Sequence, residues 1–273
     1  MTSPSNLGDY LRARRQRLQP EDVGLPGGDR RRVPGLRREE VALLAGISAE
    51  YYLRLEQGRD RHPSDQVLGS IAKALRLEDD AETYLHTLAR PARTVPRRSA
   101  RAEQASRSVQ DLIAGWATTP ALVQGRYMLT LAANPMAVAL CPLFAPGINT
   151  LRAAFCEPEM REFYRDWDEM TAKAVAYLRS VIGAAIDDPG LTELVGELSL
   201  RSERFRTLWA RQDVRHKTSG LTRLRHPQVG PLDLHYEKFA IPASPGQVLV
   251  TYHADPGSPS QEKLQLLAHL AQT

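Results

Sequence analysis

Four residues around the start of a short helical segment have side chains suited to reading DNA bases. Ser48, Ala49, Glu50 and Arg54 lie in or just before the segment AEYYLRLEQG. The guanidinium of Arg54 can donate two parallel hydrogen bonds to guanine, Glu50 can accept one from cytosine N4, and the Ala49 methyl group fits against thymine. These residue types at this spacing predict direct contact with base edges.

Basic and aromatic residues around this segment predict contacts with DNA phosphates. They are Arg38, Tyr51, Arg59 and Arg61, together with the triplet Arg30, Arg31 and Arg32. Residues 1–61 contain 12 Lys and Arg against 9 Asp and Glu, in a chain of 273 residues with a net charge of +4. Cations that neutralise phosphates release counterions, which favours binding to nucleic acid. On charge alone, a solvated basic surface is an equal alternative.

The elements that must position these residues are short helices in residues 1–90. Leu7, Tyr10 and Leu11 predict a first helix that ends near residues 18–20. The segment LRREEVALLAG predicts a second, with Val41, Leu44 and Ala45 on its inner face and Gly46 at its end. Ser48 is expected to cap the third helix, Ser64 the fourth, and Asp79 or Asp80 to open the fifth. A helix, a turn with glycine and a capped helix form the unit that places its second helix in the major groove.

A change of composition separates this part from the rest of the chain. Residues 91–104, PARTVPRRSARAEQ, hold two prolines, four arginines and one Glu, which predicts a basic linker. We therefore expect an all-α helix-turn-helix domain in residues 1–90 and a second domain in residues 105–273.

The second domain shows an α+β pattern. A helix over 109–116 is followed by two short strands around Gly125, then by a long helix from Glu159 to about Ile186 and two further helices. Alternation in LTRLRHP, PLDLHYEKFAI and QVLVTYHA predicts three strands, and SQEKLQLLAHL a final helix. This order indicates an antiparallel sheet with helices packed on it.

Apolar residues of this domain are candidates to line a ligand pocket. They are Leu131, Met136, Phe155, Trp167, Trp209, Leu234, Tyr236, Val250 and Tyr252, with Asn134 and the tyrosine hydroxyl groups as the polar contacts. Ligand pockets are mostly apolar with a few placed polar groups. The alternative is an ordinary hydrophobic core, which a domain of this size needs in any case.

No residue pattern in the sequence predicts catalysis, a metal site or a cofactor. Cys141 and Cys156 are not spaced as zinc ligands, and no HExxH, GxSxG or GxxxxGK[ST] pattern occurs. His235 and His253 are expected on adjacent strands, without the carboxylate or thiolate help that a metal site needs. No apolar run approaches the length of a membrane span, and the first residues lack a secretory signal, so we expect a cytoplasmic protein with no membrane contact.

The segment EEVALLAGISAEYYLRLEQGR, followed by PSDQVLGSIAKALRL, resembles the helix-turn-helix of Xre/Cro-type phage repressors. The longer stretch from LRARRQRLQPEDVG to LEQGR, with its arginine triplet in a long loop, resembles more specifically the MmyB-like regulators. The family's recognition positions fall on Ser48, Ala49, Glu50 and Arg54. Ala49 departs from the longer polar residue, such as Gln, of many relatives, which leaves the target sequence open.

The C-terminal segments INTLRAAFCEPEMREFYRDWDE, ELSLRSERFRTLWARQDVR, LRHPQVGPLDLHYE and VTYHADPGSPSQEKLQLL resemble the MmyB-like ligand-binding domain. The resemblance implies a PAS-like fold with an internal apolar pocket, and a fatty-acid-like or other apolar ligand.

Together these features predict a sequence-specific transcription regulator whose C-terminal domain senses a small apolar molecule such as a fatty acid. A homodimer would place two recognition helices about one turn of DNA apart on a double-stranded palindromic operator. The alternative is a DNA-binding regulator whose C-terminal domain docks a protein partner and has no ligand.

Overall fold

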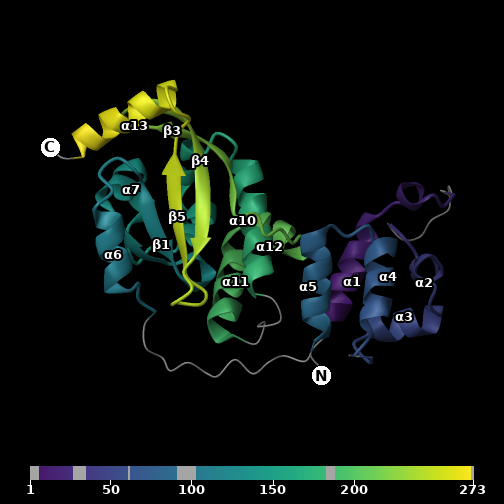
Figure 1. Ribbon diagram of the computed structural model, residues 1–273. Helices are drawn as coiled ribbons and strands as arrows, with labels where there is room; N and C mark the ends of the chain where they lie inside the picture. Colours follow the sequence, from purple (N-terminus) through teal and green to yellow (C-terminus); the bar gives the residue numbers. More distant parts are fainter. Residues whose placement is uncertain (1–5, 27–34, 61, 91–102, 183–187, 272–273) are drawn as a thin grey trace. The chain divides into compact units, whose positions relative to one another are not determined.

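The computed structural model describes residues 6–26, 35–60, 62–90, 103–182 and 188–271 (Figure 1). Contacts within the chain divide it into two compact units. The first comprises residues 1–96 with the segments 179–192 and 207–216, and the second comprises residues 97–178, 193–206 and 217–273. The border between the two units therefore runs through helices of the C-terminal region as well as through the expected linker.

Short capped helices build the first unit, as the sequence predicts. They are α1 (Asn6–Arg17), the 3-10 helix η1 (Pro20–Val23), α2 (Arg38–Ala45), α3 (Ala49–Glu56), α4 (Asp65–Ala74) and α5 (Asp79–Ala89). The Oγ atom of Ser48 accepts a hydrogen bond from the amide of Tyr51, and Ser64 caps α4 in the same way. Gly46 ends α2 with φ +67°, a conformation that favours glycine.

The core of the first unit is aromatic at its centre. Tyr10 and Tyr52 are fully buried, and the rings of Tyr10 and Tyr84 meet edge to face at 5.3 Å. The inner face of α2 differs from the prediction, because Ala42 is buried beside Val41 and Ala45 whereas Leu44 is 38% exposed. The helix is rotated relative to the expected apolar stripe, since two small alanines let it approach its neighbours closely.

Residues 207–216 complete this unit from far along the sequence. Val214 is buried in the same hydrophobic cluster as Tyr10 and Tyr52. Asp213 accepts hydrogen bonds from Arg14, at 3.3 Å, and from Arg17, both on α1. The backbone amide of His216 donates to Asp80 at 2.7 Å.

The second unit is built around an antiparallel sheet with the strand order β2-β1-β5-β4-β3. The strands are β1 (Ala121–Gln124), β2 (Thr130–Ala133), β3 (Ser219–His226), β4 (Gly230–Ala240) and β5 (Val248–His253). The other elements are α6 (Arg107–Ala114), η2 (Arg126–Met128), α7 (Pro135–Leu140), η3 (Pro142–Phe144), α8 (Thr150–Cys156), α9 (Pro158–Phe163), α10 (Trp167–Ile182), α11 (Pro189–Arg201), α12 (Glu203–Ala210) and α13 (Pro259–Leu270). Helices α10, α11 and α12 each contribute residues to both units.

The two faces of the sheet carry different clusters. On one face Leu122, Leu234 and Val250 pack with residues of α7, α9 and α13. Helix α13 lies against β4 and α7 (Figure 1). On the other face Val123 and Leu249 pack with Ile113 of α6. The strict alternation of side chains along each strand produces this division. The architecture confirms the expected fold class, a helix-turn-helix unit with a PAS-like α+β domain.

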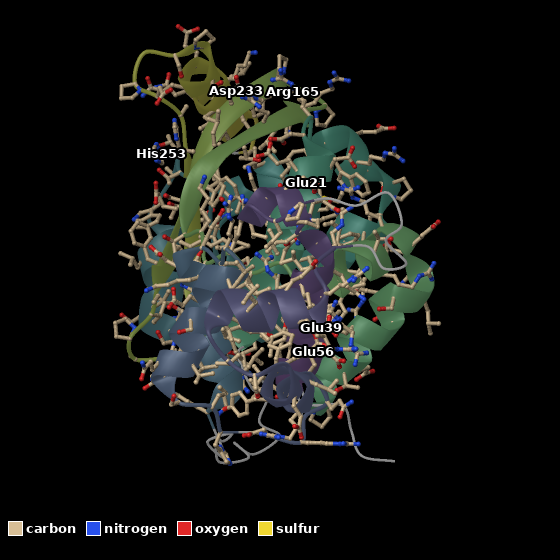
Figure 2. All side chains as sticks on the ribbon, turned by 90° about the vertical axis from the view of Figure 1, so that its right-hand side faces the viewer. Glu21, Glu39, Glu56, Arg165, Asp233 and His253 are labelled. Carbon is tan, nitrogen blue, oxygen red and sulfur yellow. The ribbon has the colours of Figure 1, made fainter. Side chains whose placement is uncertain are left out.

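The long helix predicted from Glu159 to about Ile186 is wrong, because the chain breaks between α9 and α10. Tyr164 forms an isolated antiparallel bridge with Leu224 of β3, and the amide of Arg165 donates to the carbonyl of Arg223 at 2.9 Å. An ion pair of 2.9 Å between Arg165 and Asp233 adds to this contact. Figure 2 shows these two side chains close together. The backbone at residues 164 and 165 therefore forms hydrogen bonds with the edge strand β3, and these groups are not available for the hydrogen bonds of a continuous helix.

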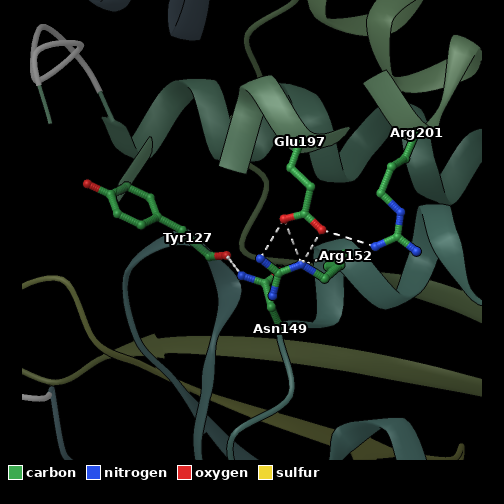
Figure 3. A network of polar contacts seen from close by, with 5 residues as sticks. All are labelled: Tyr127, Asn149, Arg152, Glu197 and Arg201. Atoms are coloured by element: carbon green, nitrogen blue, oxygen red, sulfur yellow. Dashed lines mark hydrogen bonds and ion pairs between the residues drawn. The ribbon is translucent and has the colours of Figure 1, made fainter. Parts of the chain in front are cut away.

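The predicted hairpin between β1 and β2 is confirmed, and its turn has an unusual backbone. Tyr127 and Met128 adopt φ angles of 59° and 66°, which are strained for residues with side chains. The Nδ2 atom of Asn149 donates to the carbonyl of Tyr127 at 2.8 Å, and Thr150 donates to that of Met128 at 3.1 Å. Next to Asn149, Arg152 forms a bidentate ion pair with Glu197, which also binds Arg201 (Figure 3). These bonds fix the turn in its strained form.

Candidate nucleic-acid interface

Helix α3 has one buried and one exposed face, as a recognition helix requires. Tyr52 and Leu55 are fully buried, whereas Ala49, Glu50 and Arg54 are exposed. Ser48 is also exposed and caps the N-terminal end of the helix. The structure therefore brings the predicted base-reading residues together on the solvent face, at the end of α3 that enters a major groove in helix-turn-helix proteins.

Two of these residues hold each other in the free protein. Arg54 lies 3.4 Å from Glu50, one turn before it, and its guanidinium sits 5.5 Å from the centre of the Tyr51 ring. Burial, and then the charge of Asp60, raise the pKa of Tyr51, so its phenol keeps its proton and can donate to a phosphate. Guanine would have to compete with Glu50 for the guanidinium of Arg54.

Arg38, predicted as a phosphate contact, has a side chain that is 42% exposed and also pairs with a buried carboxylate, so its DNA contact stays a prediction. Its Nε atom donates to Glu56 at 2.7 Å, and Glu56 also accepts from Arg15 at 2.5 Å. Arg15 and Glu56 are 5% and 3% exposed, and Arg15 further donates to the carbonyl of Leu36 at 2.7 Å. Figure 2 labels Glu56, the centre of this cluster. We call Arg15, Glu56 and Arg38 the ionic cluster.

The ionic cluster was missed in the sequence, although it leaves a signal there. Arg15 follows Leu11 by four residues and Glu56 follows Tyr52 by four, so each charge lies on the apolar face of its helix. Opposite charges on two apolar faces indicate a buried pair.

The remaining predicted phosphate contacts divide into two groups. Arg59 is exposed directly after α3. Arg30, Arg31, Arg32 and Arg61 lie outside the described residues. Arg37, exposed at the start of α2, and Gln57, exposed at the end of α3, are two polar residues that the sequence analysis did not single out.

Half of the ten predicted ligand residues belong to one cluster in the second unit. Met136, Leu234 and Val250 are buried there, and the half-buried Trp167 and Tyr252 pack against it. The ring of Phe155 contacts that of Trp167 at 6.4 Å. Tyr236 is half-buried next to Tyr252, its partner across β4 and β5.

Three predicted ligand residues lie elsewhere. Leu131 packs on the opposite side of the sheet, with the cluster around α6. Trp209 belongs to the first unit, where Arg179 stacks on its ring at 3.8 Å. Asn134 is buried, and its side chain forms hydrogen bonds with backbone groups. Its oxygen accepts from the amides of residues 121 and 137, and its nitrogen donates to the carbonyls of residues 113, 116 and 119.

The two histidines expected on adjacent strands face each other across β4 and β5. The rings of His235 and His253 stack at 5.3 Å, and His235 lies 3.0 Å from Asp255. Among the described residues, no group of three or more His, Cys, Asp and Glu side chains is arranged to hold a metal ion. Within the same residues, no helix combines the length and the apolar character that crossing a bilayer requires.

Comparison with known proteins finds two family matches. Residues 105–267 match the MmyB-like transcription regulator ligand binding domain, and residues 6–85 match a helix-turn-helix domain. No curated protein matches the chain. The first match covers more than half of the chain and the α+β unit described above, while the second covers α1–α5 and the face of α3 that carries Glu50 and Arg54.

Proposed function

Because the chain belongs to the MmyB-like transcription regulators and joins their ligand-binding domain to a helix-turn-helix domain, we propose that it controls transcription by coupling operator binding to a small apolar ligand such as a fatty acid. The protein is a DNA-binding transcription regulator with a ligand-binding domain. The choice of ligand, the homodimer and the reading residues are the parts that we propose.

The exposed face of α3 is the observation that carries the DNA-binding part of this proposal. A capped helix of eight residues presents Glu50 and Arg54 to solvent while Tyr52 and Leu55 anchor it. Polar side chains on a rigid, buried support are what base recognition needs, since loosely held side chains lose entropy on binding. We propose that Ser48, Ala49, Glu50 and Arg54 read bases, and that Arg37, Tyr51 and Arg59 contact phosphates.

Two arginines of this surface are expected to have different effects when each is replaced by alanine. Arg54→Ala should weaken binding to the selected operator by about 1–3 kcal/mol and relax one base position, because a base contact is lost. Arg59→Ala should weaken binding to all sequences alike and lower the salt slope by about one, because a phosphate contact is lost. Operators selected from random DNA, followed by fluorescence anisotropy at several salt concentrations, measure both.

Arg107→Ala is the matched control, because Arg107 is 86% exposed on α6 and, among the described residues, pairs with Asp111 of the same helix. It should leave operator affinity unchanged. Uniform loss across sequences on Arg54→Ala would make Arg54 a phosphate contact and contradict its proposed role.

The ligand is expected to change operator affinity. A ligand that binds the DNA-competent and the incompetent arrangement unequally shifts the equilibrium by its differential affinity, typically about 5–150-fold. Native mass spectrometry of the purified protein should show a dimer with an added mass that denaturation releases, and removal of that molecule should shift the operator Kd. An operator Kd that stays constant while the molecule is removed and restored would refute the coupling.

A further inference from the structure

One side of the antiparallel sheet is open over β3 and β4. Helix α6 covers this side at β1 and β5, where Ile113 packs with Val123 and Leu249. Successive side chains of a strand point to opposite sides of the sheet, and the residues of β3 and β4 on the side of Leu249 are all exposed or half-buried. They include Leu221, Arg223 and Arg225 on β3 and Asp233, His235 and Phe239 on β4. We call this surface the open face.

The open face carries apolar and aromatic side chains in addition to charged ones. Phe239 is 54% exposed and Leu221 is 38% exposed. Leu221 is paired with His235, and the ring of His235 stacks on that of His253 of β5 at 5.3 Å. On the solvated side of an antiparallel sheet, polar residues normally alternate with the buried apolar ones. Aromatic residues and arginine, by contrast, are enriched where two proteins meet. The open face therefore has the composition of an interface.

Both edges of the sheet are partly taken up by the chain itself. Tyr164 forms an isolated bridge with Leu224 of β3, and Leu129, directly before β2, forms another with Asn149. A partner that added a strand would need a free row of backbone groups at one of these edges. The open face, rather than an edge, is therefore the part of the sheet best suited to a partner.

The charges on the open face are arranged so that a second copy of the chain complements them. Arg223 and Asp233 lie directly opposite each other on β3 and β4. The side chain of Asp233 is 52% exposed and pairs with Arg165 (Figure 2), whereas none of the ion pairs among the described residues includes Arg223. A twofold axis along the strands, between β3 and β4, would put Arg223 of each copy over Asp233 of the other.

The same axis would put Leu221 of each copy over His235 of the other, because these two residues are also paired across β3 and β4. An axis across the strands at Leu221 would instead bring Asp233 of one copy over Glu237 of the other. Like charges that face each other across an interface disfavour that arrangement. The charges therefore select the axis along the strands.

We propose that the open face is the interface of a homodimer, in which Arg223 of each copy pairs with Asp233 of the other and Leu221 packs on the histidine rings. Sheets that pack face to face keep their strands within about 30° of each other, which suits an axis along the strands. This inference rests on the proposed function, because it assigns the surface of the proposed homodimer.

Reversal of one charge at a time tests the interface. Sedimentation velocity of the full chain without DNA, over a series of concentrations, measures the dissociation constant of the dimer. Arg223→Asp and Asp233→Arg each place like charges in both symmetric pairs, so each should weaken the dimer at least about tenfold. Arg161→Asp is the matched control and should keep the wild-type constant. Arg161 is exposed on α9, a helix that packs with the core cluster on the other side of the sheet.

An equimolar mixture of Arg223→Asp and Asp233→Arg is the sharper measurement. In a mixed dimer the two new residues face each other with opposite charges, and so do the two unchanged ones. Native mass spectrometry separates the mixed dimer from the two homodimers by mass. We expect the mixed dimer to exceed both homodimers, which also shows that the two variants are folded.

The outcomes separate this interface from the homodimer itself. A wild-type dimer that neither variant weakens overturns the interface and leaves the homodimer to another surface. Two weakened variants whose mixture stays dissociated overturn the pairing of Arg223 with Asp233 across the axis. A wild type that is monomeric when free and dimeric on its operator overturns the interface alone, and one that is monomeric in both states overturns the homodimer with it.

Discussion

Replacement of Glu56 by alanine is expected to destabilise the helix-turn-helix unit by about 3–5 kcal/mol, because it leaves a buried cation without its partner. Arg15 is 5% exposed and its guanidinium is held by Glu56 at 2.5 Å. Burial lowers the pKa of Arg15, but the hydrogen bond and charge of Glu56 outweigh it and raise that pKa overall. Without Glu56 the desolvation cost of Arg15 remains and its ionic partner is lost.

Glu50→Ala on the same helix is the matched control. Glu50 is 82% exposed and pairs with Arg54 at 3.4 Å, and exposed pairs of this spacing contribute only about 0.3–0.5 kcal/mol. Hydrogen-exchange mass spectrometry of peptides from α1 and α3 measures each loss within this unit, where a single unfolding curve of a two-unit chain does not. Equal protection in the two variants would show that the ionic cluster adds nothing to stability.

The second large effect is expected at Asn134. Its side chain caps α7 and binds five backbone groups, so Asn134→Ala removes the cap and leaves buried amides and carbonyls unpaired. The loss of an N-cap costs about 0.5–2 kcal/mol, and each buried group left without a partner costs about 1–3 kcal/mol more. We expect a loss of at least about 3 kcal/mol, or roughly 6–12 °C in Tm for a unit of this size.

Ser106→Ala provides the comparison for Asn134, because Ser106 caps α6 of the same unit through one bond to the amide of Val109. It should lose only the cap contribution. If the calorimetric transition assigned to this unit has the same Tm in the two alanine variants, the bonds of Asn134 to residues 113, 116, 119 and 121 contribute nothing measurable.

The helix ends and the strands could be predicted from the sequence, because they depend on interactions between residues close together in the chain. Ser48, Gly46 and Ser64 mark helix ends through short-range hydrogen bonds and backbone freedom. The alternation in β4 predicts a strand, because its buried residues Leu232 and Leu234 share one side. β5 has the same apolar alternation although both of its sides contact a core. These features need only neighbours in the chain, so the helix-turn-helix and the order of the C-terminal elements follow from residue patterns.

Features that depend on distant partners could not be predicted in this way. The apolar spacing from Met160 to Leu178 fits one helix, yet the chain breaks where Arg165 binds β3. Arg38 is the basic first residue of α2, and its pairing with the buried Glu56 depends on a residue 18 positions further along the chain. Asn134 has the polarity of a ligand contact, and only the positions of the carbonyls of residues 113, 116 and 119 show that its side chain binds the backbone.

The two charged residues on the exposed face of α3, Glu50 and Arg54, form an ion pair in the structure. Because Glu50 and Arg54 pair with each other, the recognition surface carries no unpaired charge from this pair when DNA is absent. When Arg54 binds a guanine, its ion pair with Glu50 is replaced by a bidentate contact with the base. Because an exposed ion pair contributes little free energy, its loss reduces the binding free energy only slightly.

The segment 207–216 has a consequence for inheritance. Val214 fills part of the core around Tyr10, and Asp213 holds α1, although both are separated from α5 by more than a hundred residues of sequence. A recombination event within residues 91–104 that joined this DNA-binding half to a foreign C-terminal half would leave that place in the core unfilled. The two halves are therefore expected to descend together, and a working chimaera should need residues 207–216 transferred along with residues 1–90.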